Sequence, residues 1–198
     1  PVLCPDRVRC VGDGVALVVA ESPEAAAEAA AAVRVDLEPL PALLDAERAL
    51  DEDAPLVHET GNRIARYVTV RGDAETALAA APHVLRRRYT TPRVQHVCIE
   101  TEAAVASYDP GTGETLVRCP VNSPFPIRKV VSETLGCPMT DVRVVLTTIG
   151  ASFGGKNYDI ALAASRAAMV SRLLCRPCKV VLNREESIEE GTKRHPLF

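Results

Sequence analysis

The sequence contains few aromatic residues and no long apolar run. Its 198 residues include 3 Phe, 4 Tyr and no Trp, so any core must be built mostly from Ala, Val and Leu. No apolar run reaches the ~18 residues that a membrane-spanning helix needs. The N-terminal stretch PVLCPDRVRC lacks the apolar region of a signal peptide. We therefore expect no membrane segment, and we interpret the chain as a fragment of something longer.

The sequence also lacks an excess of charge of one sign. Its formal net charge of −3 gives no support to a nucleic-acid-binding surface. The one sharp basic cluster, Arg86 to Arg88, lies in an expected strand, where we interpret it as a solvated or ion-paired face. With 47% apolar and 25% charged residues, the composition is that of an ordinary globular protein.

The seven Cys form no pattern typical of a secreted, disulfide-linked domain. Most of them lie inside apolar runs, as Cys98 and Cys119 do, where Cys behaves as a small hydrophobic residue. Cys175 and Cys178 form a single C-x-x-C, and a zinc site would need two further ligands, so we interpret the pair as structural. A reducing, cytoplasmic compartment fits this pattern best.

The first third of the chain predicts a strand–helix–strand unit and a linker. Residues 9–20 (RCVGDGVALVVA) predict a buried strand after a glycine turn. Ser22 is a good helix cap before an alanine-rich run. Residues 34–41 predict a short strand that two prolines end. We therefore expect one unit over 9–40 and an acidic surface linker over 41–62.

The rest of the chain predicts a second unit, beginning near residue 63. We expect strands over 63–73, 83–91, 102–109, 115–121, 141–149 and 178–183. We expect helices after a cap at Asp73, from Ser123 to Gly136, and from about Asp159 to Leu174. The turn residues DPGTGE join two of the strands into a hairpin. The predicted fold class is therefore α+β, a mixed α/β arrangement.

A glycine loop, IGASFGGKNYD at residues 149–159, lies between an expected strand and an expected helix. It nearly spells the phosphate-binding P-loop G-x-x-x-x-G-K-[ST], but Asn157 stands where that motif needs Ser or Thr. The bulky ring of Phe153 in its middle is further evidence against a nucleotide site. Such a loop still offers several backbone N–H groups near the positive end of a helix. The sequence therefore predicts a site for a phosphate, an oxyanion or a metal-bound oxo group, with a purely structural turn as the alternative.

Four segments of the chain occur together, in the same order, in one known family. They are VGDGVALVVA at 11–20 with the alanine-rich run and the E-x-L-P ending that follow it, QHVCIETEAAVASYD at 95–109, GASFGGK at 150–156 and REESIEEGTKRHPLF at 184–198. The third is similar to the loop G-G-G-F-G-G-K, and the second to a Q-x-x-x-[LI]-E-[PT] segment. Together they resemble the large molybdenum-cofactor subunit of the xanthine dehydrogenase/aldehyde oxidase family.

The resemblance implies an architecture and an activity. Residues 1–40 would form the second half of an α/β hammerhead domain, residues 41–62 a linker, and residues 63–198 the start of a molybdenum-cofactor-binding domain with mixed sheets and flanking helices. The whole enzyme would hydroxylate an N-heterocycle or an aldehyde, with water as the oxygen source.

The cofactors and partners that the resemblance implies lie partly outside this chain. The expected cofactor is molybdenum–molybdopterin, with its cytosine dinucleotide form left open. The 2Fe-2S clusters and FAD that take the electrons would lie on other domains or subunits. The other expected partners are the remainder of the large subunit and a small-molecule substrate, with no nucleic acid and no membrane.

The resemblance also implies site residues. The backbone N–H groups of Phe153 and Gly154, next to Ser152, would approach the molybdenum oxo ligand, with no direct side-chain ligand to the metal. Asn122 stands where the family often has a Gln that contacts the metal centre. Asn157 stands where purine-oxidising members carry a substrate-binding Glu. An amide cannot act as an anion, which argues against a standard xanthine oxidiser. No catalytic residue is expected here, because the family's general base belongs to a later part of the subunit.

Simpler alternatives exist for most of these residues. Asn122 and Asn157 would then each cap a following helix, and Phe153 would be a core aromatic. We expect Lys156 to be a solvated lysine rather than the partner of a pterin phosphate, and Glu100 to satisfy nearby backbone donors or an Arg. The competing function is a stand-alone, non-catalytic α/β module that binds a partner subunit or the cofactor.

Overall fold

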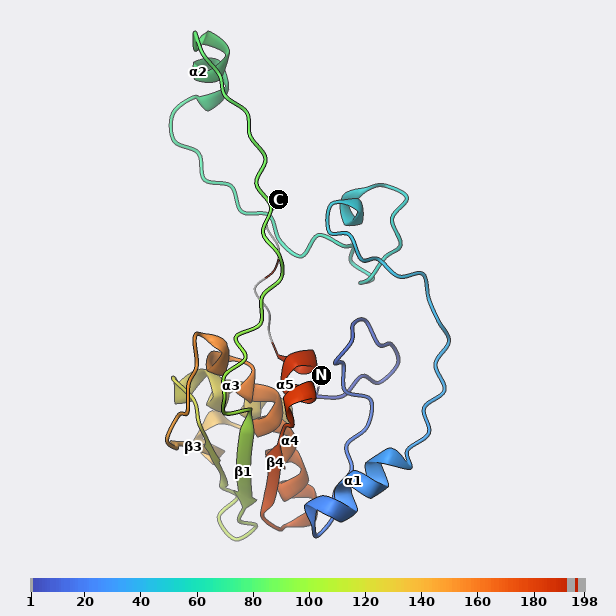
Figure 1. Ribbon diagram of the computed structural model, residues 1–198. Coiled ribbons are helices and arrows are strands. Elements are labelled where there is room, and N and C mark those ends of the chain that lie inside the picture. Colours follow the sequence, from blue (N-terminus) through green and yellow to red (C-terminus); the bar gives the residue numbers. More distant parts are fainter. Residues whose placement is uncertain (1, 192–194, 196–198) are drawn as a thin grey trace. The chain divides into compact units, whose positions relative to one another are not determined.

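The computed structural model describes residues 2–191 and His195, and it divides into two units. The first, the sheet unit, comprises the described residues up to 33 and from 91 onward. The second, the loop unit, comprises residues 34–90. Six residues of the quoted segment 184–198, at 192–194 and 196–198, lie outside the described residues. Each unit is described by itself (Figure 1).

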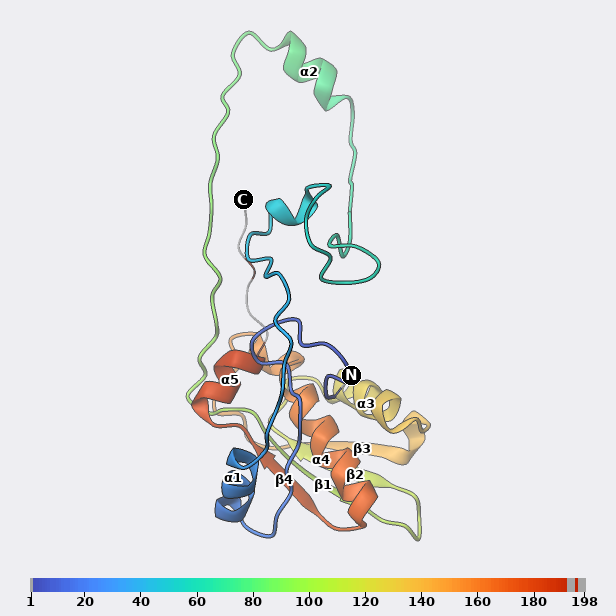
Figure 2. The same cartoon turned by 90° about the vertical axis from the view of Figure 1, so that its right-hand side faces the viewer.

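The sheet unit contains a mixed sheet of four strands in the order β3-β2-β1-β4 (Figures 1 and 2). The strands are β1 (Ala103–Tyr108), β2 (Thr115–Cys119), β3 (Val142–Leu146) and β4 (Cys178–Val181). Strand β1 pairs antiparallel with both β2 and β4, whereas β2 pairs parallel with β3. The predicted hairpin is confirmed, and its turn is held by Asp109, whose carboxylate accepts from the Gly111 N–H and the Thr112 hydroxyl.

The helices of the sheet unit are α1 (Pro23–Ala31), α3 (Pro124–Leu135), α4 (Ile160–Leu174) and α5 (Arg184–Glu190), with short 3-10 helices at Met139–Asp141 and Gly155–Asn157. The predicted helices from Ser123 to Gly136 and from about Asp159 to Leu174 are confirmed as α3 and α4. Helix α3 ends because Gly136 adopts a left-handed conformation, φ 62°, that favours glycine. Helix α5 was not predicted, although its capping box was present in the sequence: Asn183 and Glu186 exchange side-chain-to-backbone hydrogen bonds.

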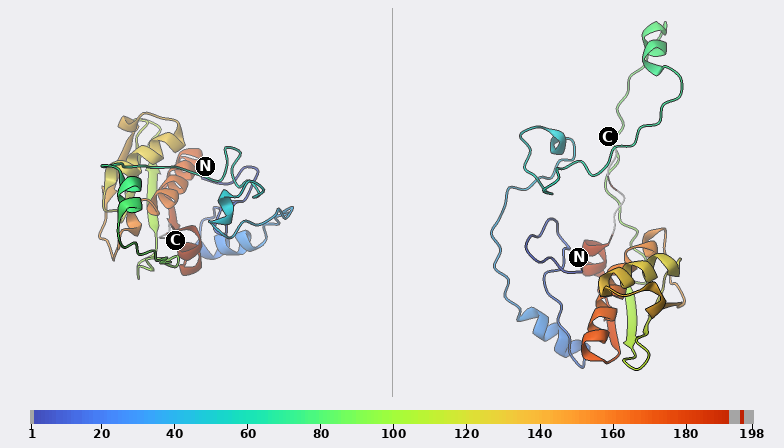
Figure 3. Two further views of the ribbon diagram at one scale, coloured as in Figure 1. Left: turned by 90° about the horizontal axis from the view of Figure 1, so that it is seen from above. Right: turned by 180° about the vertical axis from the view of Figure 1, so that it is seen from behind.

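The core lies between the sheet and the two helices α3 and α4. Both helices lie on the same face of the sheet, which the view from behind shows directly (Figure 3). The central part of α4 contributes four alanines with no exposed surface, Ala163, Ala164, Ala167 and Ala168. Opposite them, Val117 is fully buried, which stabilises the fold by about 1.5–3 kcal/mol. The core is therefore built from Ala and Val as predicted, but Leu contributes only Leu182 to the buried apolar residues described.

Four predicted strands are absent from the described part of the chain. Residues 9–20, 34–41, 63–73 and 83–91 form no β-strand, so the predicted strand–helix–strand unit keeps only its helix, α1, with Ser22 as its cap. Apolar side chains in these ranges are exposed, such as Val70 at 79%. A strand needs hydrogen-bonded neighbours, and no other described segment pairs with these ranges to form one. The prediction was wrong because an apolar or alternating pattern alone does not supply a partner.

The loop unit contains the 3-10 helix Arg48–Leu50 and helix α2 (Ala74–Ala80), and none of residues 34–90 is buried. The predicted cap of α2 is confirmed, since the Asp73 carboxylate accepts from the Thr76 N–H at 3.0 Å. Asn62 organises the region before it: its side chain accepts from the Val57 N–H and donates to the carbonyls of residues 49 and 55. No described helix in either unit is long and apolar enough to cross a membrane.

Candidate functional site

The glycine loop contains a tight turn in an unusual conformation. The Gly155 N–H donates to the Ser152 carbonyl at 2.8 Å, which closes a four-residue turn. Its two central residues have positive φ, 48° for Phe153 and 89° for Gly154, as in the type I′ turn. A left-handed conformation costs a residue with a side chain about 1–2 kcal/mol, so Phe153 is strained where Gly154 is not.

The turn presents two backbone donors outside its own hydrogen bond. In the part of the chain that the structure describes, neither the Phe153 N–H nor the Gly154 N–H donates a hydrogen bond. Both residues are exposed, and the Phe153 side chain retains 77% of its surface, so the interpretation of Phe153 as a core aromatic is wrong. Adjacent N–H groups in such a turn form a concavity suited to an anion or a metal-bound oxygen.

Three of the predicted site residues meet beside this turn. The Asn122 side-chain amide donates to the Ser152 hydroxyl at 2.7 Å and to the Asn157 side-chain oxygen at 3.0 Å. The Asn122 N–H also donates to the Lys156 carbonyl at 3.4 Å. The alternative role of Asn122 and Asn157 as helix caps is therefore wrong: residue 123, which precedes α3, and Asp159, which precedes α4, occupy the cap positions. The five predicted site residues thus form one local cluster.

A partly buried ion pair contacts the loop. Lys156 has no exposed surface, and its ammonium group pairs with Glu100 Oε2, which also accepts from the Gly150 N–H at 2.7 Å. The expected solvated lysine is therefore wrong, whereas the expectation that Glu100 satisfies backbone donors is confirmed. Burial alone would raise the pKa of Glu100, but the hydrogen bonds from Lys156 and Gly150 and the charge of Lys156 hold that pKa below its usual value.

Alternate residues of the segment 95–100 face the glycine loop. His96 lies against Gly155. A Cβ atom added to Gly155 would lie 2.9 Å from His96 Nδ1, so a larger residue would collide with the ring. The Cys98 thiol donates to the Ser152 carbonyl at 3.3 Å, and Glu100 follows two residues later. Sequence reasoning missed His96 and Cys98, because residues 95–100 form no β-strand and a spacing of two there does not by itself indicate a shared face.

Helix α5 holds the segment 95–100 in place. The Arg184 guanidinium donates to the carbonyls of Cys98 and Ile99 at 2.6 and 2.7 Å. The Gln95 side chain donates to the Ser187 carbonyl at 3.0 Å. The candidate site is therefore supported by the segment 95–100 and by helix α5, which lie far apart in the sequence.

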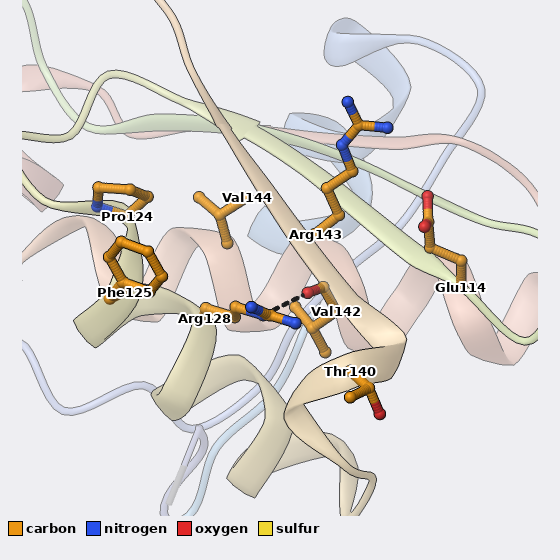
Figure 4. Close-up of a pocket in the computed structure, with 8 residues that line it drawn as sticks. All are labelled: Glu114, Pro124, Phe125, Arg128, Thr140, Val142, Arg143 and Val144. Atoms are coloured by element: carbon orange, nitrogen blue, oxygen red, sulfur yellow. Dashed lines mark hydrogen bonds between the residues drawn. The ribbon is translucent and has the colours of Figure 1, made fainter.

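A separate groove runs along the start of the edge strand β3 (Figure 4). Its volume is about 320 Å³, and it is lined by Glu114, Pro124, Phe125, Arg128, Thr140, Val142, Arg143 and Val144. The Arg128 side chain is already engaged there, because its Nε donates to the carbonyls of Met139 and Val142. None of the five predicted site residues lines this groove, so it is distinct from the loop cluster.

The cysteines provide no competing metal or redox centre among the described residues. All seven thiols are free, and no three His, Cys, Asp or Glu side chains are grouped as metal ligands in the described ranges. Burial raises the pKa of the Cys119 thiol to about 11, which keeps it protonated and unreactive. The structural interpretation of the C-x-x-C pair stays a prediction.

Two family models match the chain. The molybdopterin cofactor-binding domain matches residues 57–198, and the a/b hammerhead domain of aldehyde oxidase and xanthine dehydrogenase matches residues 1–41. The chain belongs to the xanthine dehydrogenase/aldehyde oxidase family of molybdopterin-binding subunits. The resemblance stated from the four sequence segments is thereby confirmed, together with the mixed α/β fold class.

Curated relatives of this chain are longer than the chain itself. A probable xanthine dehydrogenase subunit of Bacillus subtilis is 35% identical over 197 residues, which cover 100% of this chain and 26% of that protein. The nicotinate dehydrogenase large molybdopterin subunit of Eubacterium barkeri is 34% identical over 197 residues, which cover 100% of this chain and 46% of that protein.

Solved structures give the same result for the fold. Quinoline 2-oxidoreductase from Pseudomonas putida 86 matches with a TM-score of 0.87 at 29% identity, over 98% of this chain and 25% of that one. The reconstituted CO dehydrogenase from Oligotropha carboxidovorans matches with a TM-score of 0.87 at 31% identity, over 98% and 26%. The chain therefore spans about a quarter of each of these molybdopterin-family structures.

Proposed function

We propose that the protein to which this chain belongs is a molybdenum hydroxylase, and that the Phe153–Gly154 turn faces the metal centre of its cofactor. The observation that carries the proposal is the pair of adjacent, unused N–H groups on an exposed turn that is held at positive φ. Backbone N–H donors that are already held around an oxygen atom need no reorganisation when negative charge develops on that oxygen. The chain thus fits a cofactor whose metal carries oxygen ligands.

The bound cofactor would supply the redox chemistry, in which an aldehyde or a carbon next to nitrogen in a heterocycle is hydroxylated with oxygen from water. Electrons would leave to 2Fe-2S clusters and FAD on other domains or subunits. We propose no general base within the chain, because Glu100 is engaged by Lys156 and Gly150, and Glu102 is buried. The remainder of the large subunit would supply that group.

The Asn122–Ser152–Asn157 network would form the polar wall next to the turn. Both side-chain N–H groups of Asn122 are used, so its Oδ1 is left to accept, whereas the Asn157 oxygen is used and its amide N–H₂ is left to donate. The wall therefore offers one neutral acceptor and one neutral donor. This pair suits a heterocycle or an aldehyde better than it suits a substrate that needs a carboxylate partner, such as a purine in the family's standard xanthine oxidisers.

The turn can be tested with two matched glycine variants. Gly154→Ala and Gly113→Ala both place a side chain at positive φ, 89° and 76°, and neither added Cβ meets an atom within 4 Å. Each should therefore cost a similar ~1–2 kcal/mol of stability. In the complete protein, Gly154→Ala keeps the backbone N–H but strains the turn, and the resulting displacement of the donors from the developing charge should lower turnover by up to roughly a hundredfold, whereas Gly113→Ala should not.

The measurements are molybdenum content by mass spectrometry and kcat/KM on a panel of aldehydes, purines and pyridine carboxylates. Equal turnover in the two glycine variants would remove the turn from the site. A wild-type protein that is purified without molybdenum and cannot be loaded with it would favour the non-catalytic alternative.

Asn157→Glu tests the polar wall on the same panel. The new carboxylate should raise the transition-state free energy for anionic substrates and lower it for purine-like hydrogen-bond donors, each by about 1–3 kcal/mol. Asn157→Asp is the matched control, because it adds the negative charge without lengthening the side chain. An unchanged substrate ranking in Asn157→Glu would show that Asn157 does not contact the substrate.

A further inference from the structure

One residue near the start of the glycine loop and one near its end contact the same carboxylate oxygen. At its start, the Gly150 N–H donates to Glu100 Oε2 at 2.7 Å, and at its end the Lys156 ammonium group pairs with the same oxygen. Lys156 is fully buried, while the Glu100 side chain keeps 35% of its surface. Charge-assisted hydrogen bonds of this kind are stronger than neutral ones. The loop is therefore clamped at both ends to one atom, and we call this contact the carboxylate clamp.

The close approach of Glu100 to the loop depends on the absence of a side chain at the first clamped residue. A Cβ built at Gly150 would lie 2.8 Å from Glu100 Cβ and 3.3 Å from Glu100 Oε2. No other residue type fits there unless the segment 95–100 shifts. The contacts of His96 with Gly155 and of Cys98 with Ser152 continue the same interface along the loop. The clamp thus fixes one end of a continuous contact surface for the loop.

Between the clamped ends lies the strained turn. A left-handed Phe153 persists only if its surroundings hold it, because the residue gains about 1–2 kcal/mol by relaxing to negative φ. The hydrogen bond that closes the turn, from Gly155 to Ser152, is a single neutral contact. Since the clamp fixes Gly150 and Lys156 on the two sides of the turn, it restricts the backbone conformations in which Phe153 could relax.

We propose that Glu100 and Lys156 are positioning residues that keep the Phe153 and Gly154 N–H groups presented together. The proposal rests on the proposed function only in that the presented groups would face the cofactor. Without the clamp, the turn would relax, and the two donors would no longer point to one place. Glu100 and Lys156 would then affect turnover through the loop, without touching substrate or metal themselves.

The structure supplies a matched control for a role in stability alone. Arg166 and Glu190 form a second largely buried ion pair, with 6% and 15% side-chain exposure, and it joins α4 to α5. Neither residue hydrogen-bonds to the glycine loop. Loss of this pair should destabilise the sheet unit without changing the loop specifically.

The test compares Glu100→Gln and Lys156→Met with Glu190→Gln in the complete protein. Amide exchange of peptides from residues 149–157 is followed by mass spectrometry, alongside the thermal unfolding midpoint. In both clamp variants we expect the amides of these peptides to exchange at least roughly tenfold faster than in Glu190→Gln, when the variants are compared at the same fall in the thermal unfolding midpoint. Loop exchange that depends only on the midpoint, in the same way for all three variants, would overturn the proposal.

The second readout separates positioning from folding in the enzyme. Per molybdenum-loaded molecule, the clamp variants should lose roughly ten- to a hundredfold in kcat with little change in KM, because the displaced donors act mainly on developing charge. Glu190→Gln should keep its kcat per loaded molecule. Equal kcat in all three would contradict the positioning role. If the wild-type protein holds no molybdenum, the proposed function fails, and the exchange experiment still decides whether the clamp holds the loop.

Discussion

The sheet unit and the loop unit differ in where their apolar side chains lie. In the sheet unit, α3 and α4 cover one face of four paired strands, and Val117 and Ile127 are fully buried. In the loop unit no residue is buried, and Tyr67 and Ile64 keep more than nine tenths of their surface. Residues 63–71 carry the clearer alternation of apolar and polar side chains, whereas β1 has the sequence AAVASY, so an alternating pattern does not account for the difference. The difference is that β1 has a neighbouring strand on each side.

The comparison predicts its largest effect in amide exchange. Amides of β1 and α4 should exchange on the order of a thousandfold more slowly than in an unstructured chain, because they open only with the core. Amides of residues 63–71 should exchange within roughly tenfold of the unstructured rate. The measurement is exchange with mass spectrometry on the 198-residue chain. Strong protection of 63–71 would break the comparison, because it would require a partner strand beyond those described.

The second effect is the cost of removing an apolar side chain. Val117→Ala should lower the free energy of unfolding by about 2 kcal/mol, because it leaves a cavity beneath α4. Val70→Ala, at a residue with 79% of its surface exposed, should change that free energy by less than about 0.5 kcal/mol. Urea denaturation followed by circular dichroism gives both values. Similar losses in the two variants would show that residue 70 is covered in solution.

The third effect concerns helix caps, one taken from each unit. Asn183→Ala removes the cap of α5 and should lower the free energy of unfolding by about 1 kcal/mol. Asp73→Ala removes the cap of α2, which should fray locally and leave the denaturation midpoint unchanged. The denaturation midpoint reports the loss of stability in Asn183→Ala, and the amide exchange rate of the α2 peptide reports the local fraying in Asp73→Ala. A lowered midpoint in Asp73→Ala would mean that α2 unfolds with the core.

The smallest effect is in the acid range. Because the folded pKa of Glu100 lies below its ordinary 4.5, its stabilisation is present above about pH 4.5 and is lost as the pH falls through the folded value. The wild-type midpoint should therefore fall towards that of Glu100→Gln on acidification from about pH 7 to about pH 3. The loop unit should show the same sign locally, since hydrogen bonds from Thr76 lower the pKa of Asp73. Parallel midpoint curves for wild type and Glu100→Gln would contradict the assignment.

Much of the sheet unit could be predicted because its elements carry both a pattern and a stop signal. Helix α3 ends at a glycine, and the turn between β1 and β2 is rich in Asp and Gly. The strands predicted for 9–20 and 63–73 failed for a different reason. A sequence pattern shows which side chains face together, but it does not show whether another strand is available to pair with the backbone.

The sequence suggested residues for the candidate site, but it did not show their contacts. The loop was found from its glycines and its place between an expected strand and an expected helix, Asn122 was found through the family resemblance, and the structure brings them together. The burial of Lys156 could not be foreseen, because its partner Glu100 lies 56 residues earlier in the chain. Without that partner a lysine is expected at the surface. The domain boundaries near 40 and 63 and the roles of the site residues stay predictions.

Under the proposed function, the hydrogen-bonded network of Asn122, Ser152 and Asn157 would constrain how the substrate range of the complete protein can change. Each of the three side chains is the partner of another, so replacing one leaves a donor or an acceptor unmet on its neighbour. The effects of substitutions in such contacting groups are not additive, typically by about 0.5–3 kcal/mol. Directed evolution that varies one position at a time would therefore discard combinations that work only as pairs or triples. Libraries that randomise the three codons together should reach new substrates that stepwise searches miss.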